Sequence, residues 1–175
     1  MLKKLCAAFM ALLLLTLASV SLAEEASSIA KTLIITEVMA SNHTGLEDAF
    51  GRFPDWLEIY NTTDEAISLG GVFLSDKKNE PARYAFPADA MIQPHEYIIV
   101  FASGAKKDIA DEYHTSFKLS ALGEAIYLSR SDAILDAILF GFQETDIALA
   151  LDANGTFVQT LTPTPGSANQ ITPVQ

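Results

Sequence analysis

The chain has 175 residues, of which 50% are hydrophobic, and 22 acidic against 11 basic side chains give it a net charge of −11. This acidity works against binding to nucleic-acid phosphates, which depends on lysine and arginine. The length suits one domain with a sizeable core, and the single cysteine excludes an internal disulfide.

The N-terminal segment has the three parts of a secretory signal peptide. Two lysines precede an apolar run over 5–18, and small residues stand at Ser21 and Ala23 ahead of an acidic pair. The apolar run is shorter than the roughly 20 residues that a membrane-spanning helix needs. We therefore expect a signal peptide over 1–23 and a secreted or otherwise extracytoplasmic protein. A retained membrane anchor is the alternative.

Cleavage after Ala23 would remove Cys6 and two lysines. The mature chain would have 152 residues, no cysteine and a net charge of −13. Without disulfides, its fold must rest on the hydrophobic core. Residues 24–31 are small and polar, which predicts a flexible leader.

Short runs rich in Val, Ile, Phe and Tyr recur from residue 32 onward between turn signals, as strands do. One segment, 106–113, is a helix candidate because Ile109 and Tyr113 lie four residues apart. The turns at 130–132 and at Asn154-Gly155 are typical of hairpins. Strands are expected over 33–38, 56–60, 67–69, 72–75, 83–86, 96–101, 125–129, 134–140, 147–151 and 156–160.

Closely spaced strands without alternating helices favour an all-β sandwich or barrel over a parallel α/β sheet. Pro163 and Pro165 cannot stand in a helix or a central strand, so they mark the end of the domain. We expect residues 170–175 to form a frayed tail.

Several blocks of sequence resemble bacterial lamin-tail domains, and they follow one another in that family's order over residues 32–169. The blocks are 35–42 (ITEVMASN), 54–61 (PDWLEIYN), 74–76 (LSD), 84–87 (YAFP), 97–104 (YIIVFASG), 114–120 (HTSFKLS), 123–124 (GE) and 164–169 (TPGSAN).

The resemblance implies an immunoglobulin-like β-sandwich of the lamin-tail type, without a catalytic centre. It also implies export, since bacterial members are exported and often sit beside other modules. Many relatives carry a Gly-Arg pair before the last hairpin, where this chain has residues 149–152 (LALD). That departure puts in doubt any contact that a relative makes through the arginine.

Motifs for catalysis are missing. The three histidines, His43, His95 and His114, lack the spacing of a zinc site, and there is no Gly-x-Ser-x-Gly elbow. Ser103 and Ser120 lie near histidines in sequence, but in turn contexts that favour serine anyway. We expect no enzyme. A secreted hydrolase or metal-dependent enzyme on a β-sandwich scaffold is the alternative.

The acidic loop 47–55 is a candidate calcium site, since Glu47, Asp48 and Asp55 could supply carboxylate oxygens. In the alternative, the two aspartates make local turn bonds and Arg52 neutralises one of them. The alternation of an EF-hand is absent, so we favour the second interpretation and expect no metal or cofactor.

Trp56, Glu58 and Tyr60 alternate with Leu57 and Ile59, which predicts that the first three share one face of a strand and the last two face the core. An exposed aromatic pair beside a carboxylate would bind a sugar or a protein partner. In the favoured alternative, loops cover the rings, because the only tryptophan of a small domain is usually buried.

Together these features predict a non-catalytic binding or structural module outside the cytoplasm. Its expected partner is a cell-surface or extracellular protein or polymer, such as a polysaccharide. No nucleic-acid partner is expected, and no membrane span after signal cleavage.

Overall fold

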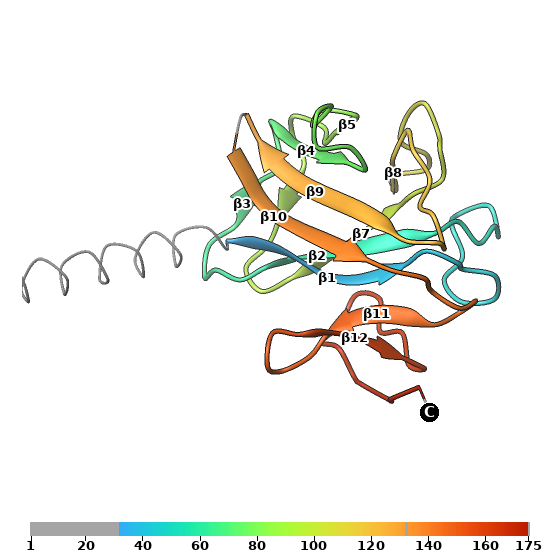
Figure 1. Cartoon of the computed structure of the whole chain (residues 1–175). Coiled ribbons are helices and arrows are strands. Elements are labelled where there is room, and N and C mark those ends of the chain that lie inside the picture. The colour runs from blue at the N-terminus through green and yellow to red at the C-terminus, as the bar shows by residue number, and fades with distance from the viewer. Residues whose placement is uncertain (1–31, 132, 175) are drawn as a thin grey trace, which may run out of the picture. The chain divides into compact units, whose positions relative to one another are not determined.

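Twelve β-strands form the regular structure of residues 32–131 and 133–174, the parts of the chain that the computed structural model describes (Figure 1). They are β1 (Leu33–Met39), β2 (Trp56–Asn61), β3 (Ile67–Ser68), β4 (Val72–Ser75), β5 (Tyr84–Ala85), β6 (Met91–Ile92), β7 (Tyr97–Phe101), β8 (Tyr113–His114), β9 (Glu124–Arg130), β10 (Ala133–Phe140), β11 (Ala148–Leu151) and β12 (Phe157–Thr160). No helix occurs in these residues, and hence none that could cross a membrane. The expected signal peptide and leader, over 1–31, lie outside the described residues.

The strands form an immunoglobulin-like β-sandwich. One sheet has six strands in the order β12-β11-β1-β2-β7-β8, the other has four in the order β10-β9-β4-β5, and β3 and β6 form a small ribbon. All neighbours are antiparallel except β7 and β8. Figure 1 shows β9 and β10 crossing over β1, β2 and β7 as the second layer. This arrangement confirms the expected fold class.

Each of the two sheets has one register shift, in β1 and in β10, and a hydrogen bond joins the two irregular segments. The register of β1 shifts between Ile35 and Glu37, and that of β10 shifts between Ile134 and Asp136. The backbone N–H of Ile35 donates to Asp136 Oδ2 at 2.8 Å. The bulge in β10 thus directs a carboxylate to an amide of the opposite sheet.

The main core lies between the two sheets and is built by alternation. Leu57 and Ile59 of β2 are fully buried and pack with Leu74 of β4, Ile126 of β9 and Ile138 of β10. Burying each such side chain stabilises the fold by roughly 1.5–3 kcal/mol. The prediction that Leu57 and Ile59 face the core is confirmed.

The expected strands are present, with ends shifted by one or two residues, and two were missed. These two, β6 and β8, have only two residues each. The hairpin of β9 and β10 and that of β11 and β12 are confirmed. In the second, the N–H of Gly155 donates to Asp152 O at 3.0 Å, and Gly155 takes the left-handed conformation (φ 77°) that glycine tolerates in such a turn.

The helix expected over 106–113 is wrong. Ile109 and Glu112 exchange backbone hydrogen bonds at 3.2 and 2.9 Å, which closes a two-residue turn. Ala110 and Asp111 inside it both have positive φ, 50° and 66°. This is the geometry of a tight hairpin turn, and a helix cannot pass through it.

The C-terminal segment makes hydrogen bonds with β12 and the residue after it. Thr172 accepts from the N–H of Leu161 and donates to Thr160 Oγ1, both at 2.9 Å. Residues 172–173 therefore lie along β12, where the sequence predicted a frayed tail over 170–175. Gln175 lies outside the described residues.

Candidate functional site

The outer face of the six-stranded sheet carries the residues that the sequence singled out as a partner site. Trp56 begins β2 on this face, but its side chain is fully buried. It packs against Met39, Phe101 and Ala148, and Leu46 of the loop between β1 and β2 packs against this cluster. Trp56 therefore stabilises a second, smaller core and offers no surface to a partner.

Glu58, the next residue on this face, is buried as well. Its Oε1 accepts from Thr36 Oγ1 at 2.6 Å and its Oε2 accepts from the N–H of Gly166 at 2.7 Å. Its register partner Glu37 is fully buried and accepts from the N–H of Thr164 at 3.1 Å. The segment after β12 thus covers both carboxylates.

Burial raises the pKa of Glu37 and of Glu58 to about 7, because desolvation disfavours the charged form. The hydrogen bonds from Thr164, Thr36 and Gly166 act in the opposite direction. For Glu37, the nearby charge of Glu58 adds to the rise. Both carboxylates are buried and already accept hydrogen bonds from Thr36, Thr164 and Gly166, so they offer no exposed surface to a partner.

Tyr60, the last of the three predicted residues, is half-buried and lies on Tyr97, its register partner in β7. The two rings stack with centroids 4.5 Å apart and planes inclined by 30°. Tyr60 Oη lies 3.2 Å from His95 Nδ1, and His95 Nε2 lies 2.8 Å from Asp64 Oδ1. Because a carboxylate only accepts, Nε2–H of His95 donates to Asp64, and the hydroxyl of Tyr60 is placed to donate to Nδ1. This series of hydrogen bonds fixes the orientation of the Tyr60 ring.

The acidic loop has the geometry of the local-turn interpretation. Asp48 accepts from Arg52 Nε at 2.7 Å and from the N–H groups of Phe50 and Arg52, both at 3.0 Å. The pKa of Asp48 is lowered: burial alone would raise it, but the hydrogen bonds and charge of Arg52 outweigh that effect. Its carboxylate is therefore already occupied by protein donors.

The three predicted calcium ligands do not converge. Glu47 is exposed, while Asp55 Oδ1 accepts from the N–H of Asn42 at 3.2 Å and has a pKa raised by burial. Within residues 32–131 and 133–174, no group of three or more His, Cys, Asp or Glu side chains is placed to hold a metal ion.

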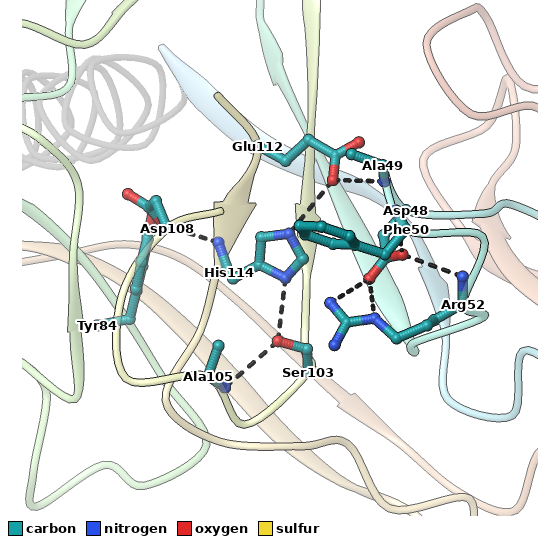
Figure 2. A network of polar contacts seen from close by, with 10 residues as sticks. All are labelled: Asp48, Ala49, Phe50, Arg52, Tyr84, Ser103, Ala105, Asp108, Glu112 and His114. Atoms are coloured by element: carbon teal, nitrogen blue, oxygen red, sulfur yellow. Dashed lines mark hydrogen bonds and ion pairs between the residues drawn. The ribbon is translucent and has the colours of Figure 1, made fainter. Parts of the chain in front are cut away.

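A buried histidine joins three separate segments, and the sequence analysis, which named His114 and Ser103, did not predict these contacts. Figure 2 shows His114 between Ser103 and Glu112, with Ser103 Oγ 3.0 Å from Nδ1 and Glu112 Oε2 3.3 Å from Nε2. The same Glu112 oxygen accepts from the N–H of Ala49 at 3.0 Å. The ring is almost fully buried and stacks on Phe101 at 5.2 Å.

The order serine, histidine, glutamate is that of a hydrolytic triad, so the surroundings decide its role. An oxyanion hole needs free N–H groups near the nucleophile. The N–H of Gly104 already donates to Phe117 O at 3.1 Å, and that of Ala105 donates to Ser103 Oγ at 3.3 Å. This arrangement ties β7, β8 and the acidic loop together and leaves neither of these amides for a substrate.

A second set of hydrogen bonds, centred on Asp108, lies beside His114. Asp108 Oδ1 accepts from Tyr84 Oη at 3.0 Å and from the N–H of His114 at 2.8 Å (Figure 2). The pKa of Tyr84 is raised, first by burial and then by the charge of Asp108. The phenol therefore stays protonated and donates, which fixes the segment before β8 against β5.

Two pairs of neighbouring lysines, Lys77-Lys78 and Lys106-Lys107, lie in exposed loops. Lys77 Nζ lies 3.4 Å from Glu80 Oε1, and Lys78, Lys106 and Lys107 are exposed. They are spread over two loops among acidic neighbours, and do not form a continuous basic surface.

The family model described as Lamin Tail Domain matches residues 26–164. A search of curated proteins finds no match.

Proposed function

The chain belongs to the lamin tail domain family, and on that basis we propose that it works as an exported, non-catalytic module that binds a protein or polymer outside the cytoplasm. The family match over residues 26–164 carries the proposal, because the family consists of immunoglobulin-like binding or structural domains. In such modules function resides on the surface.

Three features of the chain support the finer parts of the proposal. The basic, apolar and small-residue pattern over 1–23 supports export. A net charge of −11 supports a partner other than nucleic acid. The buried histidine, whose neighbouring amides are engaged, supports a structural role for the polar network of Figure 2.

Capture of a partner tests the binding role. The full chain is expressed in the producing cell with a C-terminal tag, and culture fluid and envelope fractions are cross-linked and purified. We expect a specific protein or polymer to be enriched over an acidic immunoglobulin-like control domain of equal size. Recovery of nothing beyond the control would contradict the proposal.

Mass spectrometry of the same material tests export. We expect the recovered protein to begin at Glu24, after loss of residues 1–23. A chain that keeps these residues and stays in the cytoplasmic fraction would overturn the extracytoplasmic part, whatever it binds.

One observation favours a hydrolase as the second candidate, namely the contact of Ser103 Oγ with His114 at 3.0 Å. A fluorophosphonate probe reacts with activated serines and separates the two functions. We expect no labelling of the full chain. Labelling that is lost in the Ser103→Ala variant would establish a nucleophilic serine and replace the binding module as the leading interpretation.

A further inference from the structure

The aromatic pair of this domain extends across two strands and borders a hollow. Tyr60 and Tyr97, both half-buried, line a hollow of about 270 Å³ together with the turn between β11 and β12. That turn contributes Asp152 and Ala153, and the remaining lining residues are Ile34, Thr36, Leu151 and Asn169.

Polar groups with unused hydrogen-bonding capacity lie around this aromatic surface. No residue in the described parts of the chain hydrogen-bonds the hydroxyl of Tyr97. Asp152 Oδ1 accepts from the N–H groups of Asn154 and Thr156, both at 2.9 Å, while Oδ2 accepts only from the Asn154 side chain at 3.3 Å. Since a carboxylate oxygen has two lone-pair sites, Oδ2 can accept a further donor from a ligand.

We propose that this hollow binds one sugar ring of an uncharged polysaccharide, packed against Tyr60 and Tyr97. The inference rests on the proposed function and names its partner class. A pyranose ring presents C–H bonds on its faces, which pack on aromatic rings, and hydroxyls around its edge, which both donate and accept. The tyrosine pair and Asp152 provide these two kinds of contact side by side.

Size and charge restrict the ligand further. Pockets for larger organic ligands measure roughly 300–1,000 Å³, so a hollow of about 270 Å³ suits a single ring of a longer chain. Asp152 at the rim and the net charge of −11 disfavour acidic sugars.

The geometry of the rings favours a sugar over a cationic ligand. Aromatic cages that bind quaternary ammonium groups surround the cation with ring faces. Tyr60 and Tyr97 instead stack on each other at 4.5 Å, which leaves no space for a cation between them. The stack leaves each ring its outer face, and the flat face of a pyranose ring packs on one such aromatic face.

Titration calorimetry of the full chain tests the site with four neutral probes: the hexasaccharides of chitin, cellulose, xylan and β-1,3-glucan. We expect saturable binding of at least one. Tyr97→Ala should weaken it at least about tenfold, as loss of an aromatic anchor does, while Tyr97→Phe keeps the ring and should lose less. Phe50→Ala is the matched control, since Phe50 is 63% exposed and lies outside the hollow.

Absence of binding to all four probes would overturn the proposal, and so would equal affinities of Tyr97→Ala and Phe50→Ala. Binding of choline in place of the sugars would identify a cation site instead. If Tyr97→Ala does not fold, Tyr60→Ala decides, because Tyr60 lines the same hollow and unchanged affinity of that variant would overturn the site.

The outcome is separable from that of the proposed function. A partner captured equally well by wild type and by Tyr97→Ala would keep the binding module and reject the sugar site. Failure of both capture and calorimetry would reject both.

Discussion

Glu37 of β1 and Glu58 of β2 are register partners, and the segment after β12 covers both of their carboxylates. Thr164 donates its N–H to Glu37 at 3.1 Å, and Gly166 donates its N–H to Glu58 at 2.7 Å. Burial raises the pKa of both groups to about 7. The contact between sheet and tail is therefore linked to proton binding.

This pair should make the fold less stable as the pH rises from about 4.5 to about 7. In that range the unfolded chain releases protons that the folded chain keeps, so stability that is full below the unfolded pKa of 4.5 is lost as the pH passes the folded pKa of about 7. Glu37→Gln removes one buried charge and should raise the free energy of unfolding near pH 8 by roughly 1–2 kcal/mol.

Urea denaturation near pH 4.5 and near pH 8 measures the effect, with the difference between variant and wild type as the readout. Glu47→Gln removes an equal charge from an exposed loop and serves as the control. Asp48, whose pKa is lowered, affects wild type and both variants alike and cancels in the difference. Equal stabilities of Glu37→Gln and Glu47→Gln at both pH values would contradict the linkage.

Alternation of residues within β2 predicted which side chains share a face, but not how the outer face is covered. It placed Leu57 and Ile59 in the core, where they lie, and put Trp56, Glu58 and Tyr60 on the opposite face. It could not reveal what covers that face, because the covering residues come from a preceding loop and from a segment more than 100 positions away. Tertiary packing decides such burial, and local periodicity carries no signal for it.

Tyr97 and His114 belong to the site only through the pairing of strands, which the sequence analysis did not predict. Tyr97 meets Tyr60 only because β2 and β7 pair antiparallel, a register that their sequences alone leave open. His114 reaches Ser103 through the parallel pairing of β7 and β8. A strand of two residues such as β8 has too few positions to show alternation. Ile109 and Tyr113, on either side of the turn before it, lie four residues apart, which is also the spacing of a helix.

Trp56→Ala should destabilise the protein strongly. The side chain is fully buried between Met39, Phe101 and Ala148, and deleting such a ring costs about 3–5 kcal/mol. Tyr60→Ala removes a half-buried ring and should leave the protein folded. Thermal unfolding followed by circular dichroism compares the two. Similar melting temperatures would show that the second core does not contribute as its burial indicates.

Gly123→Ala should also destabilise, for a different reason. Gly123 has φ 103°, and a Cβ there would lie 2.6 Å from the carbonyl oxygen of Phe140. Since the obstacle is backbone, we expect a loss of about 2–4 kcal/mol in the free energy of unfolding. Gly141→Ala is the matched control, because a Cβ at Gly141 meets nothing within 4 Å, and it should change stability by less than about 0.5 kcal/mol. Chemical denaturation of both variants measures the difference, and equal free energies of unfolding would contradict the steric explanation.

Removal of calcium should not change the melting temperature. Asp48 already accepts from Arg52 and from backbone N–H groups, and Glu47 is exposed, so the loop gains its rigidity from protein donors. Scanning calorimetry in chelator and in millimolar calcium measures this directly. Arg52→Ala, by contrast, should lower stability by about 1–3 kcal/mol because it leaves the carboxylate of Asp48 short of donors. A rise in melting temperature with calcium in wild type would restore the metal-site hypothesis.

His114→Ala tests whether the network of Figure 2 holds the fold. The imidazole is buried, stacks on Phe101 and lies within hydrogen-bonding distance of Ser103 and Glu112, so its removal opens a cavity and strands two polar groups. We expect a loss of about 2–4 kcal/mol in the free energy of unfolding. His43→Ala removes an exposed imidazole and should change it by less than about 0.5 kcal/mol. Equal denaturation midpoints for the two variants would mean that the buried histidine is not needed for stability. Its contact with Ser103 would then favour the hydrolase alternative over a structural role.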